Sequence, residues 1–371
     1  MIRVAIVAGK MDSGGKKNLI MEYYRHIDRN KVQFDFICDS DSQAIPKEEI
    51  ESLGGRVYEI APYQSILKNM ADMKRIFKEN KYPVVHAYNS TMNLFPMLVA
   101  KKCGVPVRIS ESLSMAHEGD WKTVLKKMLR PMSKCFANHY MSCGEDCGRW
   151  QFGNKLFNAG RVDVFKTAIN TEFNAYNPEI RRKTRKQFGW EDKIVVGHIG
   201  RFTIQKNSVH MIEIFGEVAK REPRALLCLI GDGELKEEMM NKIKELGIEN
   251  QVDYLGRRED IQQFYNAMDC FLLPSLYEGL PVVGLEAESC GLPMFFSTEI
   301  TKEANACELG HFISLDKSVE VWADEIIKAC KANMPIRKSH AKEVAEAGFD
   351  SREEAIRMQK YYFDNIKKEE R

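Results

Sequence analysis

The chain has 371 residues, of which 44% are hydrophobic and 29% charged, so its composition is that of a folded protein of about two domains. The net charge of +2 excludes the strong basic excess of a dedicated nucleic-acid binder, and no apolar run approaches the roughly 18 residues of a membrane span. The first apolar run is too short for a signal peptide, and the ten scattered cysteines predict reduced thiols in a cytoplasmic protein without a zinc site.

The first half of the chain alternates short apolar runs with longer amphipathic segments. Helical patterns cover 16–27, 65–79 and 93–102. The runs that we interpret as strands are 3–8, 34–39, 84–88, 107–110, 139–143 and 162–166. Apolar strands separated by helices are typical of a parallel sheet that is covered on both faces, so this half predicts a doubly wound α/β domain.

The second half repeats the pattern. Its predicted strands are 194–199, 225–230, 252–255, 270–274, 294–297 and 312–315. Strand signals stop in the segment 170–191, where turn residues and a charged run follow. We therefore expect one domain over 1–170 and a second over 171–350. Residues 351–371 form a last helix that opens with a capping-box spacing, and its apolar face is expected to carry Ala355, Ile356, Tyr362, Phe363 and Ile366.

The loop after the first predicted strand contains a glycine pair. Gly14 and Gly15 stand directly before a helical pattern, and glycines there let the backbone and the helix N-terminus approach a phosphate. The spacing is neither that of a P-loop nor G-x-G-x-x-G. A plain strand-to-helix turn is the alternative.

Two glutamates follow the strand 270–274. Glu278 lies in the loop before a predicted helix and Glu286 lies within that helix, so that the eight intervening steps span roughly 12 Å. That distance suits the sugar and the ribose of a nucleotide sugar, whose hydroxyls carboxylates can bind. The N–H groups of Gly279 and Leu280 at the helix start would be available to phosphate. The alternative is that one glutamate caps the helix and the other is solvated.

Two basic residues follow the strand 194–199. Arg201 and Lys206 are expected at the same edge of the second sheet as the two glutamates. Two positioned cations can neutralise a departing diphosphate without a metal ion.

Together these motifs resemble the retaining glycosyltransferases of family 4, which have the GT-B fold. The matching segments are Gly200-Arg201 with Lys206-Asn207, Gly231-Asp232-Gly233, Leu255-Gly256-Arg257 and the Glu278-x7-Glu286 pattern after Pro274-Ser275. The N-terminal segment Met11–Gly15 and Ser297–Glu303 are similar to the branch that builds bacterial capsules and exopolysaccharides.

The resemblance implies two Rossmann-like domains that face a central cleft, with the last helix crossing back to the first domain. It implies retaining transfer from a nucleotide-diphosphate sugar, with UDP the expected nucleotide, to a lipid-diphosphate-linked or growing saccharide. By the same resemblance, Arg201 and Lys206 bind the diphosphate, Glu278 the sugar and Glu286 the ribose.

Further residues take roles from the resemblance. Gly15 would pass close to the phosphate and Arg257 would lie near the base. On the acceptor side, Glu111 stands where relatives often carry histidine, and His117 follows in the same loop. A sugar-nucleotide epimerase and a non-catalytic sugar-nucleotide-binding protein are the competing interpretations.

Two further segments resemble a metal motif and a membrane-binding helix. Asp39-Ser40-Asp41 has the Asp-x-Asp spacing of metal-dependent transferases but follows a first-domain strand, so we interpret it as a loop and expect catalysis without a metal or other cofactor. The segment Lys122–Lys134 places basic and apolar residues on opposite helical faces. Such a helix either packs in the domain or contacts an anionic membrane, and a lipid-linked acceptor favours peripheral contact with the inner face of the cell membrane.

Overall fold

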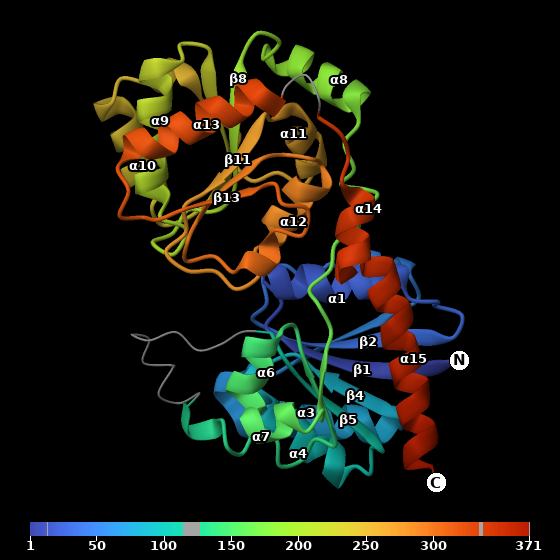
Figure 1. Cartoon of the computed structure of the whole chain (residues 1–371). Helices are drawn as coiled ribbons and strands as arrows, with labels where there is room; N and C mark the ends of the chain where they lie inside the picture. Colours follow the sequence, from blue (N-terminus) through green and yellow to red (C-terminus); the bar gives the residue numbers. More distant parts are fainter. Residues whose placement is uncertain (13, 114–126, 334–336, 371) are drawn as a thin grey trace. The chain divides into compact units, whose positions relative to one another are not determined.

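The computed structural model describes residues 1–12, 14–113, 127–333 and 337–370, and the chain divides into two compact units (Figure 1). The first unit comprises Met1–Ala168 and Ser351–Arg371, and the second comprises Ile169–Asp350. Each unit is built around one parallel sheet, which confirms the doubly wound α/β architecture. Within the described ranges, no helix is long and apolar enough to cross a membrane.

The first unit contains a seven-stranded parallel sheet in the order β3-β2-β1-β4-β5-β6-β7. Its strands are β1 (Ile2–Gly9), β2 (Val32–Asp39), β3 (Arg56–Ile60), β4 (Val84–Ala87), β5 (Val107–Ser112), β6 (His139–Ser142) and β7 (Val162–Val164). Its helices include α1 (Gly15–His26), α2 (Lys47–Ser52), α3 (Ile66–Asn80), α4 (Leu94–Lys102), α6 (Glu145–Phe152), α7 (Asn154–Asn158) and α15 (Ser351–Glu369). The strand order reverses between β1 and β4, where open α/β sheets bind ligands.

The sequence pattern did not predict the strand β3. It lies at the edge of the sheet, and Arg56 and Glu59 are exposed. An edge strand needs no continuous apolar run, so the hydrophobic pattern that reveals the central strands is missing there.

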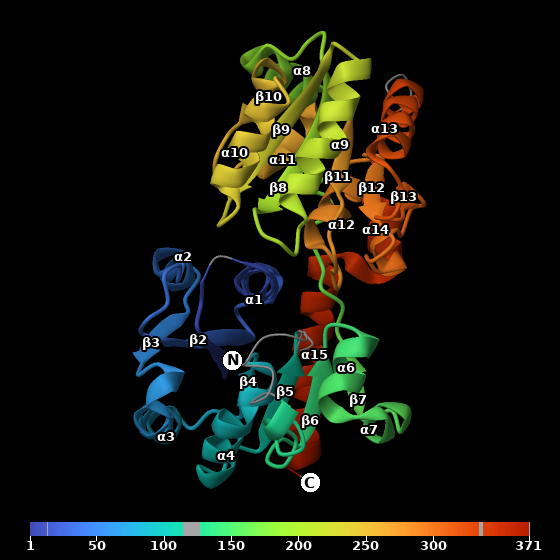
Figure 2. The ribbon, with the colours of Figure 1, turned by 90° about the vertical axis from the view of Figure 1, so that its left-hand side faces the viewer.

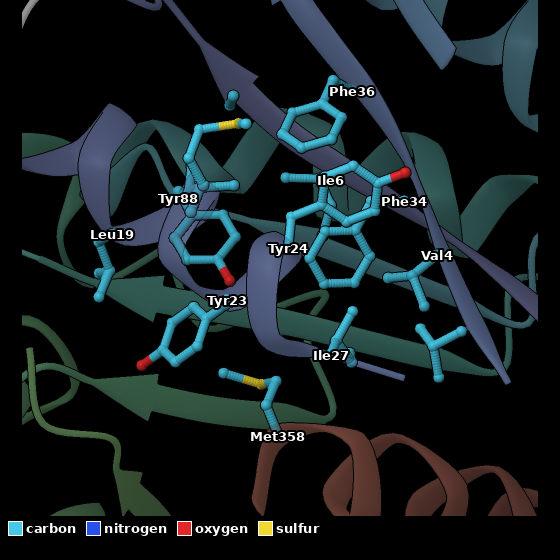
Figure 3. Close-up of a cluster of buried hydrophobic side chains, with 14 of the residues drawn as sticks. Val4, Ile6, Leu19, Tyr23, Tyr24, Ile27, Phe34, Phe36, Tyr88 and Met358 are labelled. Carbon is cyan, nitrogen blue, oxygen red and sulfur yellow. The ribbon is translucent and has the colours of Figure 1, made fainter. Parts of the chain in front are cut away.

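The core of the first unit joins β1, β2, α1 and the distant helix α15. Figure 3 shows the ring of Tyr24 among those of Phe34 and Phe36, with Met358 approaching from α15. The rings of Tyr24 and Phe34 stack with their centroids 5.1 Å apart. The C-terminal helix is therefore part of this core, although more than 300 residues separate it from β1.

The buried face of α15 differs from expectation at one position. Ala355, Met358 and Tyr362 are fully buried, whereas 65% of Ile356 is exposed. Residues 355, 358 and 362 recur at helical spacing, and the residue after 355 is turned by about 100° away from that stripe. Ile356 therefore lies outside the core, and the expectation for this residue was wrong.

The second unit contains a six-stranded parallel sheet in the order β10-β9-β8-β11-β12-β13, and Figure 2 labels all six strands. Its strands are β8 (Ile194–Arg201), β9 (Ala225–Asp232), β10 (Val252–Tyr254), β11 (Cys270–Leu273), β12 (Met294–Ser297) and β13 (Gly310–Ile313). Its helices include α8 (Pro178–Phe188), α9 (Ser208–Arg221), α10 (Lys236–Glu245), α11 (Ile261–Ala267), α12 (Val282–Ser289), α13 (Val319–Asn333) and α14 (Ala341–Val344). Here the strand order reverses between β8 and β11.

Candidate functional site

The loops that follow β8 and β11 bring a cation and a carboxylate together. The ammonium of Lys206 forms an ion pair with the carboxylate of Glu278, and both side chains are largely buried, with 16% and 11% exposed. The hydroxyl of Ser275 donates a hydrogen bond of 3.1 Å to Glu278 Oε1. The structure thus places two of the expected site residues in contact at the reversal point of the second sheet.

Hydrogen bonds to backbone carbonyls tie these two loops together. The N–H of Leu276 donates to the carbonyl of Gln205 at 2.8 Å, and Gln205 Nε2 donates to the carbonyl of Tyr277 at 3.2 Å. The side chains of Lys206 and Glu278 are therefore held by a common framework and not by two independent loops. Fixed donors and acceptors of this kind need little rearrangement when a ligand binds.

Helix α12 follows the same loop and carries Glu286. Pro281 is the residue before the helix, which has neither a side-chain cap nor an acidic residue in its first turn. The hydroxyl of the buried Tyr265 donates to Glu286 Oε2 at 2.7 Å. Burial and the neighbouring Glu286 raise the pKa of Tyr265 well above its usual value, so its hydroxyl remains a donor. Gly279 is exposed and Leu280 half-buried in the loop between Glu278 and the helix.

Two arginines lie at the same edge of this sheet. Arg201 is the exposed last residue of β8 and is paired in the sheet with Asp232 of β9. Arg257 Nε lies 3.6 Å from Asp232 Oδ2, and 74% of the Arg257 side chain is exposed. Lys206, Glu278 and both arginines thus lie at or just beyond the carboxyl ends of β8, β10 and β11.

The glycine pair belongs to the first unit. Gly14 precedes α1 with a φ of 152°, a backbone conformation that side chains with a Cβ rarely adopt, and Gly15 is the first residue of the helix. A Cβ added at either position would meet no heavy atom within 4 Å. The start of α1 carries no side-chain cap, so its first N–H groups are available to an anion.

Lys16, the next residue, is a feature that the sequence-based site did not include. Its ammonium donates to the carbonyl of Ala8 at 2.6 Å and to Asn89 Oδ1 at 3.2 Å. Burial lowers the pKa of Lys16, and the nearby Asp39 opposes that shift. An ammonium has three donors, so one further hydrogen bond is available to a ligand. A basic residue directly after the glycine pair was the signal in the sequence.

Lys16 lines a cavity of about 460 Å³ in the first unit. The cavity lies where β1, β2 and β4 end, and Tyr63, Tyr88 and Phe95 contribute aromatic walls. Apolar walls with a few convergent polar groups are typical of small-molecule sites.

The expected acceptor-side residue Glu111 has no exposed surface. Its Oε2 lies 2.8 Å from Nε2 of the equally buried His86. The hydroxyls of Tyr362 and Tyr88 lie 2.9 Å and 3.2 Å from His86 Nδ1. Glu111 therefore contacts this buried cluster and does not line the cavity, whereas Tyr88 belongs to both.

Two other expectations concern residues near the first sheet. His117 and most of the segment Lys122–Lys134 lie outside the described residues. Asp39 ends β2, and Asp41 pairs with Lys10 at 3.2 Å. In the part of the chain that the structure describes, no three His, Cys, Asp or Glu side chains gather as a metal site.

Comparisons with known proteins fit this geometry. The family described as "Glycosyl transferases group 1" matches residues 180–348, which contain Lys206, Glu278 and Glu286. The chain is 33% identical over 359 residues to EpsF of Bacillus subtilis, designated a glycosyltransferase, and the match covers 95% of this chain and 94% of that protein. The chain belongs to the group 1 glycosyltransferases.

This group 1 glycosyltransferase is also similar to a second bacterial glycosyltransferase and to a solved structure. Over 244 residues, 62% of each chain, it is 25% identical to an Escherichia coli protein, the UDP-Gal:alpha-D-GlcNAc-diphosphoundecaprenol alpha-1,3-galactosyltransferase. The crystal structure of Anabaena HepE in complex with UDP has a TM-score of 0.76 at 19% identity, and covers 98% of this chain and 100% of that chain. The relatives favour sugar transfer over epimerisation, and HepE shows that the fold is GT-B.

Proposed function

We propose that this glycosyltransferase transfers a sugar, with retention of configuration, from UDP-sugar to a lipid-linked saccharide during exopolysaccharide or capsule synthesis. The observation that carries the proposal is the pairing of Lys206 with Glu278 at the reversal point of the second sheet. The names of the relatives support the substrates, because the Escherichia coli protein is named for UDP-Gal and a diphosphoundecaprenol acceptor, and HepE was crystallised with UDP.

In the proposed reaction, the bond between the anomeric carbon and the donor diphosphate breaks, and the diphosphate leaves with the electron pair. A new bond forms from the acceptor hydroxyl on the same face of the sugar, and that hydroxyl passes its proton to the leaving diphosphate oxygen. Lys206 and Arg201 stabilise the charge that develops on the leaving diphosphate, so that no metal ion is required. The carboxylates of Glu278 and Glu286 accept hydrogen bonds from the sugar and the ribose, respectively.

The proposed donor contacts extend beyond these four residues. Gly14 and Gly15 contact phosphate through their backbone, the N–H groups of Gly279 and Leu280 do the same, and Arg257 lies near the base. The acceptor is proposed to use the 460 Å³ cavity of the first unit, where Lys16 provides a cation beside apolar walls. Because the proposed acceptor is lipid-linked, the enzyme is proposed to act at the cytoplasmic face of the membrane and to contact it through the basic segment Lys122–Lys134.

Thermal-shift measurements with UDP-, GDP- and ADP-sugars identify the donor, and turnover is then measured with lipid-diphosphate saccharides. We expect Lys206→Ala to lower turnover at least about a hundredfold, the scale of losing one contact to transition-state charge. Glu286→Ala should lower kcat/KM by about ten- to a hundredfold, because the ribose loses a hydrogen bond to a charged group. Lys220→Ala is the matched control, because 76% of that lysine is exposed on α9 of the same unit.

Three outcomes would contradict the proposal. Wild-type turnover in either site variant would remove the assigned site. Conversion of the donor alone into an isomeric sugar nucleotide would show an epimerase. Donor binding without turnover across a panel of acceptors would show a non-catalytic binding protein.

A further inference from the structure

His198 lies in β8, one residue beyond the last position at which this strand is paired with β11. The backbone pairing of these strands includes Val196 with Cys270 and Gly197 with Phe271. At the next position a side chain connects them, because His198 Nδ1 lies 2.9 Å from the carbonyl oxygen of Leu272. A carbonyl only accepts, so Nδ1 carries the hydrogen and donates it. The imidazole thus links the two strands whose loops carry the ion pair.

The other ring nitrogen of His198 is a buried acceptor. The residue has no exposed surface, and burial lowers its pKa to about 4, so the ring is neutral at pH 7. With the hydrogen on Nδ1, Nε2 presents a lone pair, and among the described residues it has no hydrogen-bond partner. Leaving such an acceptor unsatisfied is unfavourable, so a donor that reaches it only in the liganded state would recover this loss.

The side chain of Lys206 is a flexible donor that approaches this acceptor. A Cβ added to Gly200 would lie 3.3 Å from His198 Nε2 and 3.8 Å from Lys206 Cε, so both groups approach the same side of Gly200. Lys206 is also one of the groups that lower the pKa of His198, which places its charge within electrostatic range. A side chain at position 200 would therefore lie against both groups.

We propose that His198 is a positioning residue of the donor site, whose Nε2 accepts a hydrogen bond from the Lys206 ammonium when the donor diphosphate is bound. The inference rests on the proposed function, because it uses the diphosphate as the ligand of Lys206. The three N–H groups of the ammonium then have three acceptors: Glu278, a diphosphate oxygen and His198. A neutral acceptor fixes the direction of the ammonium without competing with the diphosphate for its charge.

Two substitutions separate this role from the link between the strands. In His198→Asn the amide nitrogen can replace Nδ1 as donor to Leu272, but the acceptor at Nε2 is lost. In His198→Gln the longer side chain can place an oxygen near the position of Nε2, but the link to Leu272 is weakened. Binding of UDP, GDP and ADP to the full chain is measured by calorimetry, and thermal unfolding is measured without ligand.

We expect His198→Asn to unfold close to the wild-type temperature and to bind the preferred nucleotide about tenfold more weakly, a change of about 1.4 kcal/mol. His198→Gln should unfold at a lower temperature and bind within about threefold of the wild-type protein. If His198→Asn binds like the wild-type protein, or if both variants lose affinity only in proportion to lost stability, His198 is purely structural and the inference fails.

A double-mutant cycle tests whether the effect passes through Lys206. Base and ribose contacts keep nucleotide binding measurable in Lys206→Met, and we expect His198→Asn to cause no further loss in that background. Additive losses would show that His198 does not act through Lys206 and would overturn the inference. If no nucleotide binds the wild-type chain, the proposed function fails and the inference with it, whereas wild-type binding with unaltered His198→Asn overturns the inference alone.

Discussion

At the residue scale, both glutamates of the candidate site in the second unit have side-chain partners. Lys206 contacts Glu278, and Tyr265 donates to Glu286 at 2.7 Å. The positions of Lys206 and Glu278 after predicted strands placed both at one sheet edge, so their proximity follows from the strand pattern and the rule for parallel sheets. Tyr265 could not be found in that way, because it lies 21 residues from Glu286 on another helix.

The lowered pKa of His198 predicts how the free energy of unfolding changes with pH. Its pKa falls from an ordinary value of 6.5 to about 4 on folding, so between these values the unfolded chain binds a proton that the folded chain does not. Stability is therefore lost as the pH falls from 6.5 to 4, with a limit of about 3 kcal/mol for this residue, and is unaffected by it above pH 7. Urea unfolding of the wild-type chain across this range measures the loss.

The control for this pH dependence is His198→Asn, which removes the titrating group and retains a donor to Leu272. Its unfolding free energy should fall less steeply than that of the wild-type chain between pH 6.5 and 4. Equal slopes in the two proteins would show that His198 does not titrate on unfolding.

At the element scale, the helix α15 completes the core of the first unit from the far end of the sequence. Ala355, Met358 and Tyr362 are fully buried, and the Tyr362 hydroxyl reaches the His86–Glu111 pair. The apolar periodicity of residues 351–371 predicts an amphipathic helix whose apolar face must be buried against another part of the chain. The partner surface depends on tertiary structure, since β1, β2 and α1 contribute to the core that it joins.

Substitutions along α15 test its contribution. Tyr362→Ala should lower the unfolding free energy of the first unit by about 3–5 kcal/mol, because it leaves a cavity in a closed core. Tyr362→Phe keeps the ring and should cost about 1–3 kcal/mol through the lost hydrogen bond to His86. Ile356→Ala on the exposed side should stay within about 0.5 kcal/mol of the wild-type chain.

Urea unfolding combined with hydrogen exchange in β1 and β4 assigns these losses to the first unit. Equal stabilities of Tyr362→Ala and Ile356→Ala would mean that α15 does not contribute to this core.

At the scale of the whole molecule, a net charge of +2 provides little general attraction to an anionic membrane, so any binding must come from a local patch. Residues 127–134 are the described end of the basic segment. In this end, the exposed fractions of Met128 and Met132 are 69% and 50%. Lys127, Arg130 and Lys134 accompany these methionines. Apolar and basic side chains together suit the interface of an anionic bilayer.

We expect the triple variant Lys127→Gln/Arg130→Gln/Lys134→Gln to bind phosphatidylglycerol vesicles at least tenfold more weakly at low salt. Each basic residue near such a surface contributes about 1 kcal/mol. Vesicle co-sedimentation measures the change. The matched control is Lys68→Gln/Lys74→Gln/Lys78→Gln, which removes the same charge from exposed positions on α3. Equal losses in both variants would indicate general electrostatic attraction, and no loss in either would exclude the proposed contact.

The sequence by itself determined that the chain forms two parallel α/β units, and it indicated which loops carry charged residues beyond the strand ends. Both are local properties, since a run that is apolar on both faces must be buried and the loop after it lies at a known sheet edge. Only the tertiary structure decided that Glu111 is buried against His86, that Tyr265 holds Glu286 and that His198 bridges β8 and β11. These contacts depend on strand order and register, which join residues far apart in the chain and which no local pattern specifies.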